Sequence, residues 1–234
     1  GLIVSVTLRE EEYPAFAEAF GALQQSFSQD VFPAASFDWQ VEPENEGLTS
    51  SSRVQYVGKG ANFLRLGYRY TGSMAVLETL LRYDYFWTKI RVQGGAYGAF
   101  TGFNRNGFMY FGSYRDPNLL ETLAVFDGTA DYAAHFTASE REMDKFIIGT
   151  MSGVDTPLTP MMKGDAAATC YLRGITEADR QQRRAEILAT RQEDIRALAP
   201  LIADCMKENV LCVFGNDEKI AAAKDACGSI KPAL

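Results

Sequence analysis

"RVQGGAYGAF", residues 91–100, stands between a predicted helix and a predicted hairpin and decides how the two meet. Two adjacent glycines, Gly94 and Gly95, separate Arg91 from Tyr97. Glycine adopts backbone angles that other residues avoid, and it lets a second backbone approach closely. The stretch therefore predicts a sharp turn that aims a permanent cation and a phenol toward one point.

The residues on the two sides of this turn differ in periodicity. Before it, apolar side chains at helical spacing predict a helix that ends near Lys89: Met74, Leu77, Leu81 and Tyr85. After it, residues 107–116 (GFMYFGSYRD) predict a strand, and NRNG at 104–107 predicts the turn of a hairpin. Because a hairpin pairs its strands antiparallel, the pattern favours an antiparallel or mixed sheet.

The N-terminal part of the chain predicts a strand, a helix and a loop. Residues 2–8 (LIVSVTL) are rich in β-branched side chains and predict a buried strand. The next segment has one apolar helical face: Tyr13, Phe16, Phe20, Leu23 and Phe27. Residues 42–52 predict a polar loop, and residues 53–63 predict a strand that glycines interrupt at a bulge.

Helices predominate after the hairpin. Ser139 with Glu142 forms a capping box that opens one helix, and Thr176 caps another. Residues 153–166 predict a loop at their start, with two prolines. An earlier helix in this region is marked by its apolar face: Leu119, Leu123, Phe126 and Ala130.

The last part of the chain predicts a helix, a short strand and a final helix. Thr190 with Glu193 forms a further capping-box pattern, and Pro200 is expected to kink the helix that follows. Residues 210–215 predict a buried strand, and 217–226 a helix. The complete order predicts an α+β fold, with an antiparallel or mixed sheet packed against helices, in a single domain over residues 1–234.

Composition and charge narrow the classes of function. The chain is 47% hydrophobic and 23% charged, as globular proteins are. Its net charge of −7 argues against nucleic-acid binding, which needs a basic surface. No apolar run approaches the roughly 18 residues that span a bilayer. Acidic residues concentrate in residues 1–50, where they either attract a cationic peptide or form a solvated surface.

The spacing of the four cysteines matches no zinc knuckle or C-x-x-C motif. They are Cys170, Cys205, Cys212 and Cys227. We interpret them as buried free thiols, which predict a reducing compartment such as the cytoplasm.

Several catalytic chemistries lack their residues in this chain. His135 is the one histidine, whereas a histidine-based zinc site normally needs two or three. H-E-x-x-H, H-x-x-E-H and G-x-S-x-G are all absent. We therefore expect no metal site here and interpret His135 as a cation at a helix end.

Arg91 and Tyr97 remain as candidates for chemistry. Arginine keeps its charge at any working pH, and both side chains donate hydrogen bonds that stabilise an oxyanion. In the alternative reading, Arg91 is a surface cation at a helix end and Tyr97 is packed in the sheet. The residues alone leave both readings open.

The stretch IRVQGGAYGAF resembles the R-x-x-G-G-A-Y-G element of inverted-motif zinc metallopeptidases of the insulinase and pitrilysin group, in the branch of presequence protease and falcilysin. YVGKGANF (56–63) and VLCVFGN (210–216) also look like strands of that branch. The resemblance covers residues 50–225, and it implies one domain of a hollow, two-half clamshell.

By this resemblance, the chain is a C-terminal substrate-binding domain that partners an N-terminal half. That half binds the catalytic zinc through H-x-x-E-H, so the chain is expected to be inactive alone. Arg91 and Tyr97 are implied to bind the peptide substrate and stabilise the oxyanion. Gly94, Gly95 and Ala96 are implied to lie against the substrate backbone.

The zinc-bearing half has no counterpart in this sequence. We expect the chain to be roughly the last quarter of a larger peptidase, because residue 1 leads directly into a predicted strand and no initiating methionine is present. The alternative is a non-catalytic scaffold or binding subunit that works with a zinc-bearing homologue.

Overall fold

The computed structural model describes residues 2–28, 30, 33, 35–38 and 45–233. Contacts along the chain group it into two compact units. Unit 1 comprises Gly1–Glu42 and Thr156–Asp179, and unit 2 comprises Pro43–Asp155 and Arg180–Leu234. The expectation of a single domain over 1–234 stays a prediction.

Unit 1 contains the short 3-10 helix η1 (Glu10–Glu12), α1 (Tyr13–Gln24) and α6 (Pro160–Arg173). The predicted N-terminal helix is thus confirmed. The prediction of a buried strand over residues 2–8 is wrong, because these residues form neither strand nor helix and are exposed. β-branched side chains favour an extended backbone, but a strand also needs a neighbour with which to share hydrogen bonds.

The loop predicted at the start of residues 153–166 is found at residues 155–159. Helix α6 begins at Pro160, where Thr159 accepts a hydrogen bond from the backbone N–H of Met162 at 3.3 Å. Proline is tolerated in the first helical turn because its missing N–H has no partner there anyway. Of the two prolines in this segment, Pro157 therefore lies in the loop and Pro160 marks the helix start.

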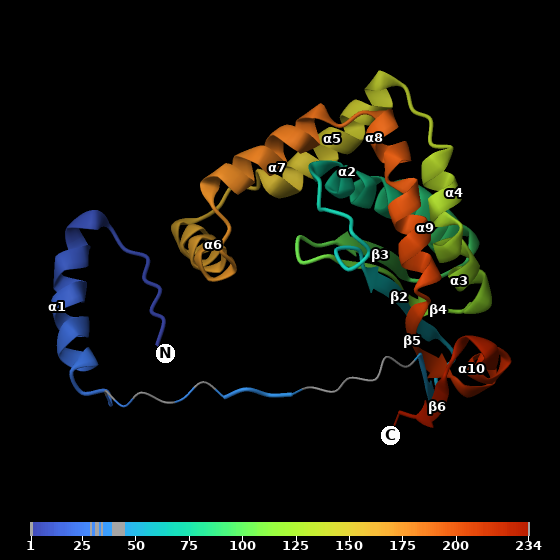
Figure 1. The fold of residues 1–234 in the computed structure, drawn as a ribbon, viewed down its shortest axis with the longest axis horizontal. Helices are drawn as coiled ribbons and strands as arrows, with labels where there is room; N and C mark the ends of the chain where they lie inside the picture. Colours follow the sequence, from blue (N-terminus) through green and yellow to red (C-terminus); the bar gives the residue numbers. More distant parts are fainter. Residues whose placement is uncertain (1, 29, 31–32, 34, 39–44, 234) are drawn as a thin grey trace. The chain divides into compact units, whose positions relative to one another are not determined.

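Unit 2 is built on a six-stranded mixed sheet in the order β3-β4-β2-β5-β1-β6 (Figure 1). β2 pairs antiparallel with β4 and β5, while β1 pairs parallel with β5 and β6. The strands are β1 (Glu46–Ser50), β2 (Gln55–Asn62), β3 (Gly98–Phe103), β4 (Phe108–Asp116), β5 (Val210–Asn216) and β6 (Ser229–Pro232). The predicted α+β fold with a mixed sheet is confirmed.

The helices of unit 2 follow the predicted order closely. The π-helical segments η2 and η3 extend α2 to the turn at residue 94. The helices are α2 (Gly72–Leu80), η2 (Leu81–Tyr85), η3 (Trp87–Gln93), α3 (Leu120–Asp127), α4 (Thr129–Ala134), α5 (Glu140–Val154), α7 (Glu177–Ala189, in this unit from Arg180), α8 (Gln192–Ala197), α9 (Ala199–Lys207), α10 (Asp217–Ala222) and η4 (Lys224–Ala226).

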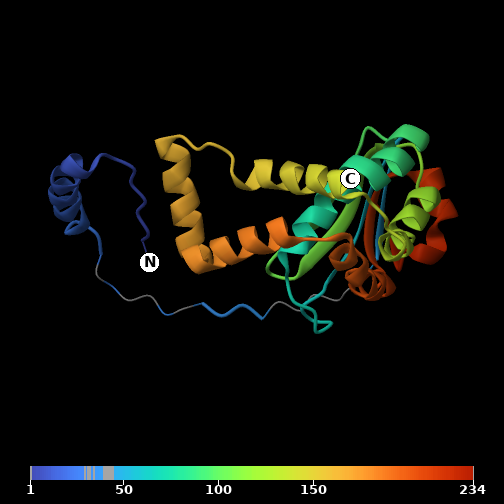
Figure 2. The ribbon, with the colours of Figure 1, turned by 90° about the horizontal axis from the view of Figure 1, so that it is seen from above.

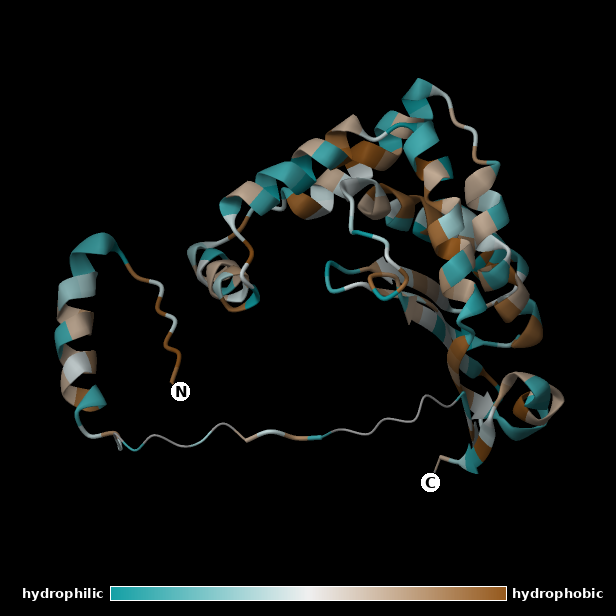
Figure 3. Ribbon diagram, in the orientation of Figure 1, coloured by the Kyte–Doolittle hydropathy of each residue, from teal (hydrophilic) through white to brown (hydrophobic). Residues whose placement is uncertain are grey.

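One face of the sheet is covered by helices and forms the core. Along β2, buried residues alternate with partly exposed ones, so every second side chain points toward the helices. α2 and η3 contact β3, and α3 and α9 contact β2. Figure 2 shows α2 lying over the strands, and Figure 3 shows apolar segments along α9.

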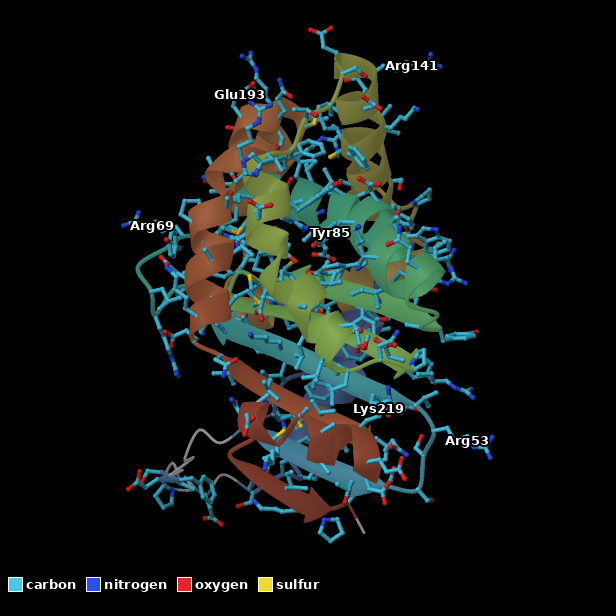
Figure 4. The ribbon with its side chains drawn as sticks, turned by 90° about the vertical axis from the view of Figure 1, so that its right-hand side faces the viewer. Arg53, Arg69, Tyr85, Arg141, Glu193 and Lys219 are labelled. Carbon is cyan, nitrogen blue, oxygen red and sulfur yellow. The ribbon has the colours of Figure 1, made fainter. Side chains whose placement is uncertain are left out.

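Aromatic side chains join the helices to one another and to the sheet. Phe86 and Phe111 are fully buried, with their ring centroids 5.0 Å apart. Tyr85 lies among the helices in Figure 4, where its hydroxyl donates to the carbonyl of Val125 at 3.2 Å. Burial raises the pKa of Tyr85, so this phenol stays a neutral donor.

Two strands lie outside what the sequence predicts. Residues 46–50 form β1, so the loop predicted over 42–52 is wrong there, and its positions 42–44 lie outside the described residues. β6 is likewise not predicted. β1 has a polar sequence that contains a glycine. A glycine is needed at position 47 because this residue faces α10, where a Cβ atom would come within 2.6 Å of Ile220.

The cap predicted before residue 195 is displaced by one position. Thr190 does not cap the new helix, since its hydroxyl donates to the carbonyl of Glu186 at 2.8 Å. Instead, the backbone N–H of Arg191 donates to Asp194 at 2.8 Å and opens α8. The predicted effect of Pro200 is confirmed, because the helix is divided at Leu198 into α8 and α9.

All four cysteines are free, as predicted, but they differ in burial. Cys205 is buried, whereas Cys212 is exposed on β5 and Cys170 and Cys227 are half-buried. The prediction of uniformly buried thiols is therefore wrong for Cys212, because its position on β5 points to the sheet face without helices.

We expect Asp127→Ala to lower the free energy of unfolding by about 2 kcal/mol, because it leaves the buried ammonium group of Lys59 without a partner. Nζ of Lys59 lies 2.6 Å from the carboxylate of Asp127, and the Lys59 side chain is 5% exposed. Urea denaturation measures the change. Asp131→Ala, which removes an exposed carboxylate, is the control; an equal loss in both variants would contradict the assignment.

We expect a thiol reagent at pH 8 to modify exposed Cys212 faster than buried Cys205, which stays intact until the protein unfolds. Burial, reinforced by the charges of Asp204 and Glu208, raises the pKa of Cys205 to about 11, so little reactive thiolate forms. Mass spectrometry of the labelled sites tests this, with Cys212→Ser expected to remove the fast phase. Labelling of native Cys205 at the rate of Cys212 would refute it.

Candidate functional site

The glycine turn follows directly from the end of η3. Gly95 has φ of +80°, in the left-handed region that favours glycine. Its N–H donates to the carbonyl of Arg91 at 3.0 Å, and the N–H of Ala96 donates to that of Ile90 at 3.1 Å. These bonds cap the helix end and reverse the chain into β3.

Gly94 is required for a different reason. A Cβ atom at this position would lie 2.5 Å from the carbonyl oxygen of Ile90, closer than atoms can pack. The two glycines thus have separate tasks: Gly94 provides space against the helix end, and Gly95 provides the backbone angle. The sequence prediction of a sharp turn here is confirmed.

Arg91 lies in the last turn of η3 and is exposed. Its guanidinium carbon stands 4.0 Å from the ring centroid of Trp87, one helical turn earlier. A cation over an indole face is stabilised by about 0.5–1 kcal/mol at an exposed site. Arg91 therefore rests on Trp87, with its hydrogen-bonding edge still accessible to solvent.

Tyr97 is 68% exposed and is not part of the sheet core. Its backbone N–H donates to the carbonyl of Tyr114 at 3.1 Å, which fixes the start of β3 against β4. The ring meets that of Tyr114 edge to face, with centroids 5.7 Å apart. The reading of Tyr97 as a packed core residue is therefore wrong.

Tyr97 begins a row of aromatic rings on the sheet face that lies opposite the helices. The centroid of Tyr114 is 5.2 Å from that of Tyr56, which in turn is 5.5 Å from that of Phe214. The row crosses β4, β2 and β5. The ring of Phe100 packs directly over Gly112, because a Cβ atom on Gly112 would come within 2.3 Å of that ring.

The other residues of the stretch divide between surface and core. Gly95 is exposed and Gly94 is half-buried, so the backbone of the turn is accessible. Ala96 is 4% exposed and its N–H is bonded within the turn. Its methyl group belongs to the core, which leaves the backbone carbonyl as the group of Ala96 that could meet a ligand.

His135 lies apart from this turn, at the C-terminal end of α4. Its Nδ1 stands 3.0 Å from the carbonyl of Asp131, in a hollow of about 510 Å³ that Asp84 and Tyr132 also line.

Among the residues that the structure describes, no three His, Cys, Asp or Glu side chains converge to hold a metal ion. Within the same residues, no helix has the length and apolarity to cross a membrane.

Asn118 is a residue of this site that sequence reasoning did not identify. Its amide group donates to the carbonyl of Gly94 at 2.6 Å, from the loop between β4 and α3. The sequence signal was RDPN at 115–118, which is typical of a turn but does not show where its side chains point.

Comparisons with known proteins identify relatives of this chain. The chain is 42% identical over 233 residues to "Protein HypA" of Clostridium perfringens, covering 100% of this chain and 24% of that protein. It is 35% identical over 191 residues to "Presequence protease 1, chloroplastic/mitochondrial" of Arabidopsis thaliana, covering 81% and 18% of the two proteins. The chain thus spans less than a quarter of the length of either relative.

Solved structures share the fold. A crystal structure of pitrilysin matches with a TM-score of 0.60 at 15% identity, over 88% of this chain and 23% of that one. The peptidase M16 inactive domain from Pseudomonas fluorescens matches with a TM-score of 0.54 at 14% identity, over 87% and 51%. Residues 45–215 also match the family described as "PreP C-terminal domain", and the chain belongs to this family of peptidase domains.

Proposed function

We propose that this chain is the C-terminal substrate-binding domain of a zinc-dependent metalloendopeptidase that degrades peptides. The observation that carries the proposal is the match of residues 45–215 to the PreP C-terminal domain family. The name of the Arabidopsis relative, a presequence protease, supports the peptidase activity. The exposure of Arg91 and Tyr97 on the two sides of the glycine turn supports their roles.

In this proposal, Arg91 and Tyr97 act on the carbonyl group of the scissile peptide bond. Arg91 contributes a permanent positive charge with several N–H donors, and Tyr97 contributes one neutral O–H donor. Both favour the oxyanion that forms as the carbonyl carbon becomes tetrahedral. Arg91 lies in the last turn of η3, and Tyr97 directly precedes β3.

The rest of the peptide lies along the sheet face without helices. The aromatic row from Tyr97 to Phe214 offers apolar contact area next to the proposed reacting bond. At the turn, the exposed backbone of Gly95 lets the peptide main chain approach closely. Together these features favour extended peptides with bulky apolar side chains over folded proteins.

The described residues of this chain do not fit a zinc site, as their His, Cys, Asp and Glu side chains form no cluster of three. We assign the zinc ion to an N-terminal catalytic half, which is the partner that this domain requires. In the alternative, a non-catalytic scaffold subunit, Tyr97 has no catalytic role. An experiment on Tyr97 therefore distinguishes the two proposed functions.

We expect Tyr97→Phe, in the peptidase assembled with its zinc-bearing half, to lower kcat/KM for a peptide by roughly 10- to 1,000-fold, on the scale of losing one oxyanion donor. The ring and its contact with Tyr114 are kept, so the effect isolates the hydroxyl. Initial rates with a fluorogenic peptide provide the measurement.

The matched control is Tyr83→Phe, since Tyr83 is exposed to a similar degree (65%) but lies on η2. We expect it to keep wild-type turnover. Unchanged turnover in Tyr97→Phe would remove Tyr97 from catalysis and favour the scaffold alternative.

We expect the isolated 234-residue chain to hydrolyse no peptide and to bind no stoichiometric zinc, because the residues that the structure describes form no set of metal ligands. Metal analysis after dialysis and a peptide assay with added zinc measure both. Zinc-dependent hydrolysis by the pure chain would overturn the division of labour proposed here.

A further inference from the structure

The glycine turn is held from outside by the loop that follows β4. Nδ2 of Asn118 donates to the carbonyl oxygen of Gly94 at 2.6 Å. Next to it, Cγ of Pro117 lies 3.5 Å from the place where a Cβ atom on Gly95 would be. Residues 117–118 therefore lie beside both glycines, and Asn118 holds Gly94 through a hydrogen bond.

A buried carboxylate fixes the position of Asn118. Asp116 is 0% exposed. One of its oxygens accepts from the backbone N–H of Asn118 at 2.9 Å, and the other accepts from the hydroxyl of Thr122 at 2.7 Å. Since both oxygens are engaged, the loop has one well-defined conformation and the Asn118 amide points at Gly94.

A bulge in β4 turns Asp116 inward. Two residues, Tyr114 and Arg115, lie opposite the single residue Tyr56 of β2, and Arg115 has φ of +49°. Side chains alternate between sheet faces, so Ser113 faces the helices and an uninterrupted strand would turn Asp116 to the opposite face. The extra residue reverses this parity and brings Asp116 opposite buried Gln55, which donates to its carbonyl at 3.1 Å.

We infer that Asn118 is a positioning residue for Tyr97. The inference rests on the proposed function, because it assumes that the Tyr97 hydroxyl acts on substrate. Gly94 and Gly95 are the most flexible residues available, and Tyr97 stands two residues beyond them. The bond from Asn118 fixes the peptide plane of Gly94, and with it the direction in which the chain enters Gly95. Arg91, upstream in η3, is held by the helix itself.

The first test is Asn118→Ala in the assembled zinc-bearing peptidase. We expect kcat to fall roughly 10-fold with KM changed less than about 3-fold, because a displaced donor loses transition-state stabilisation more than binding. Asn104→Ala is the matched control: its amide also donates to a backbone carbonyl, that of Phe108 at 3.2 Å, but at the far end of the β3–β4 hairpin. Equal effects of the two variants would overturn the inference.

The second test asks whether Asn118 acts through Tyr97. In a Tyr97→Phe background, we expect Asn118→Ala to lower kcat by less than about 2-fold further, since coupled residues are not additive. A full additional loss would overturn the inference. If Tyr97→Phe alone has no effect, the proposed function fails; if Tyr97→Phe is slow but Asn118→Ala is not, the positioning role alone fails.

Variants of Thr122 keep the inference testable if Asn118→Ala does not fold. Thr122→Ser retains the hydroxyl bonded to Asp116 and is expected to retain most of kcat. Thr122→Val has nearly the same shape without that hydroxyl, and we expect it to lower kcat in the same direction as Asn118→Ala. Equal activity of the two Thr122 variants would show that the Asp116 network does not position the turn.

Discussion

The pairing of β2 with both β4 and β5 is the constraint on which unit 2 depends. β2 is joined to β4 and β5 by antiparallel ladders, although β5 lies some 150 residues further along the chain. Its alternating burial divides the sheet into a face that holds the helices of unit 2 and a face on which the side chains of β2 are partly exposed. This alternation also decides which face carries the aromatic row, because Tyr56 points to the face opposite the helices.

The candidate site combines one residue from the helical layer with one residue from the sheet. Arg91 reaches it from the helical layer, whereas Tyr97 lies at the start of an edge strand and turns its ring onto the open face. The two are joined by a turn that only glycine accommodates at Gly95. The site is thus a junction between the two layers, which is why it depends on a helix end, a hairpin and a loop at once.

Local patterns in the sequence were sufficient for most elements of unit 2. The apolar spacing before Lys89, the NRNG turn and the capping box at Ser139 each depend on neighbours within a few residues, and all three are confirmed. β1 was missed because its polar sequence becomes a strand only between β5 and β6, whose residues come more than 160 positions later. Asn118 was missed for a related reason, as a bulge decides where it points.

The bulge at Arg115 also makes β4 sensitive to length in a way that its composition does not reveal. Deleting Arg115 would restore regular alternation along β4 and would turn Asp116 from the helical face to the opposite face. The length of the hairpin tip at 104–107 does not affect which way the strand side chains point, since the tip only joins the ends of β3 and β4. Related sequences can therefore be expected to vary in loop size at the tip while keeping an unchanged residue count from the start of β4 through to the start of α3.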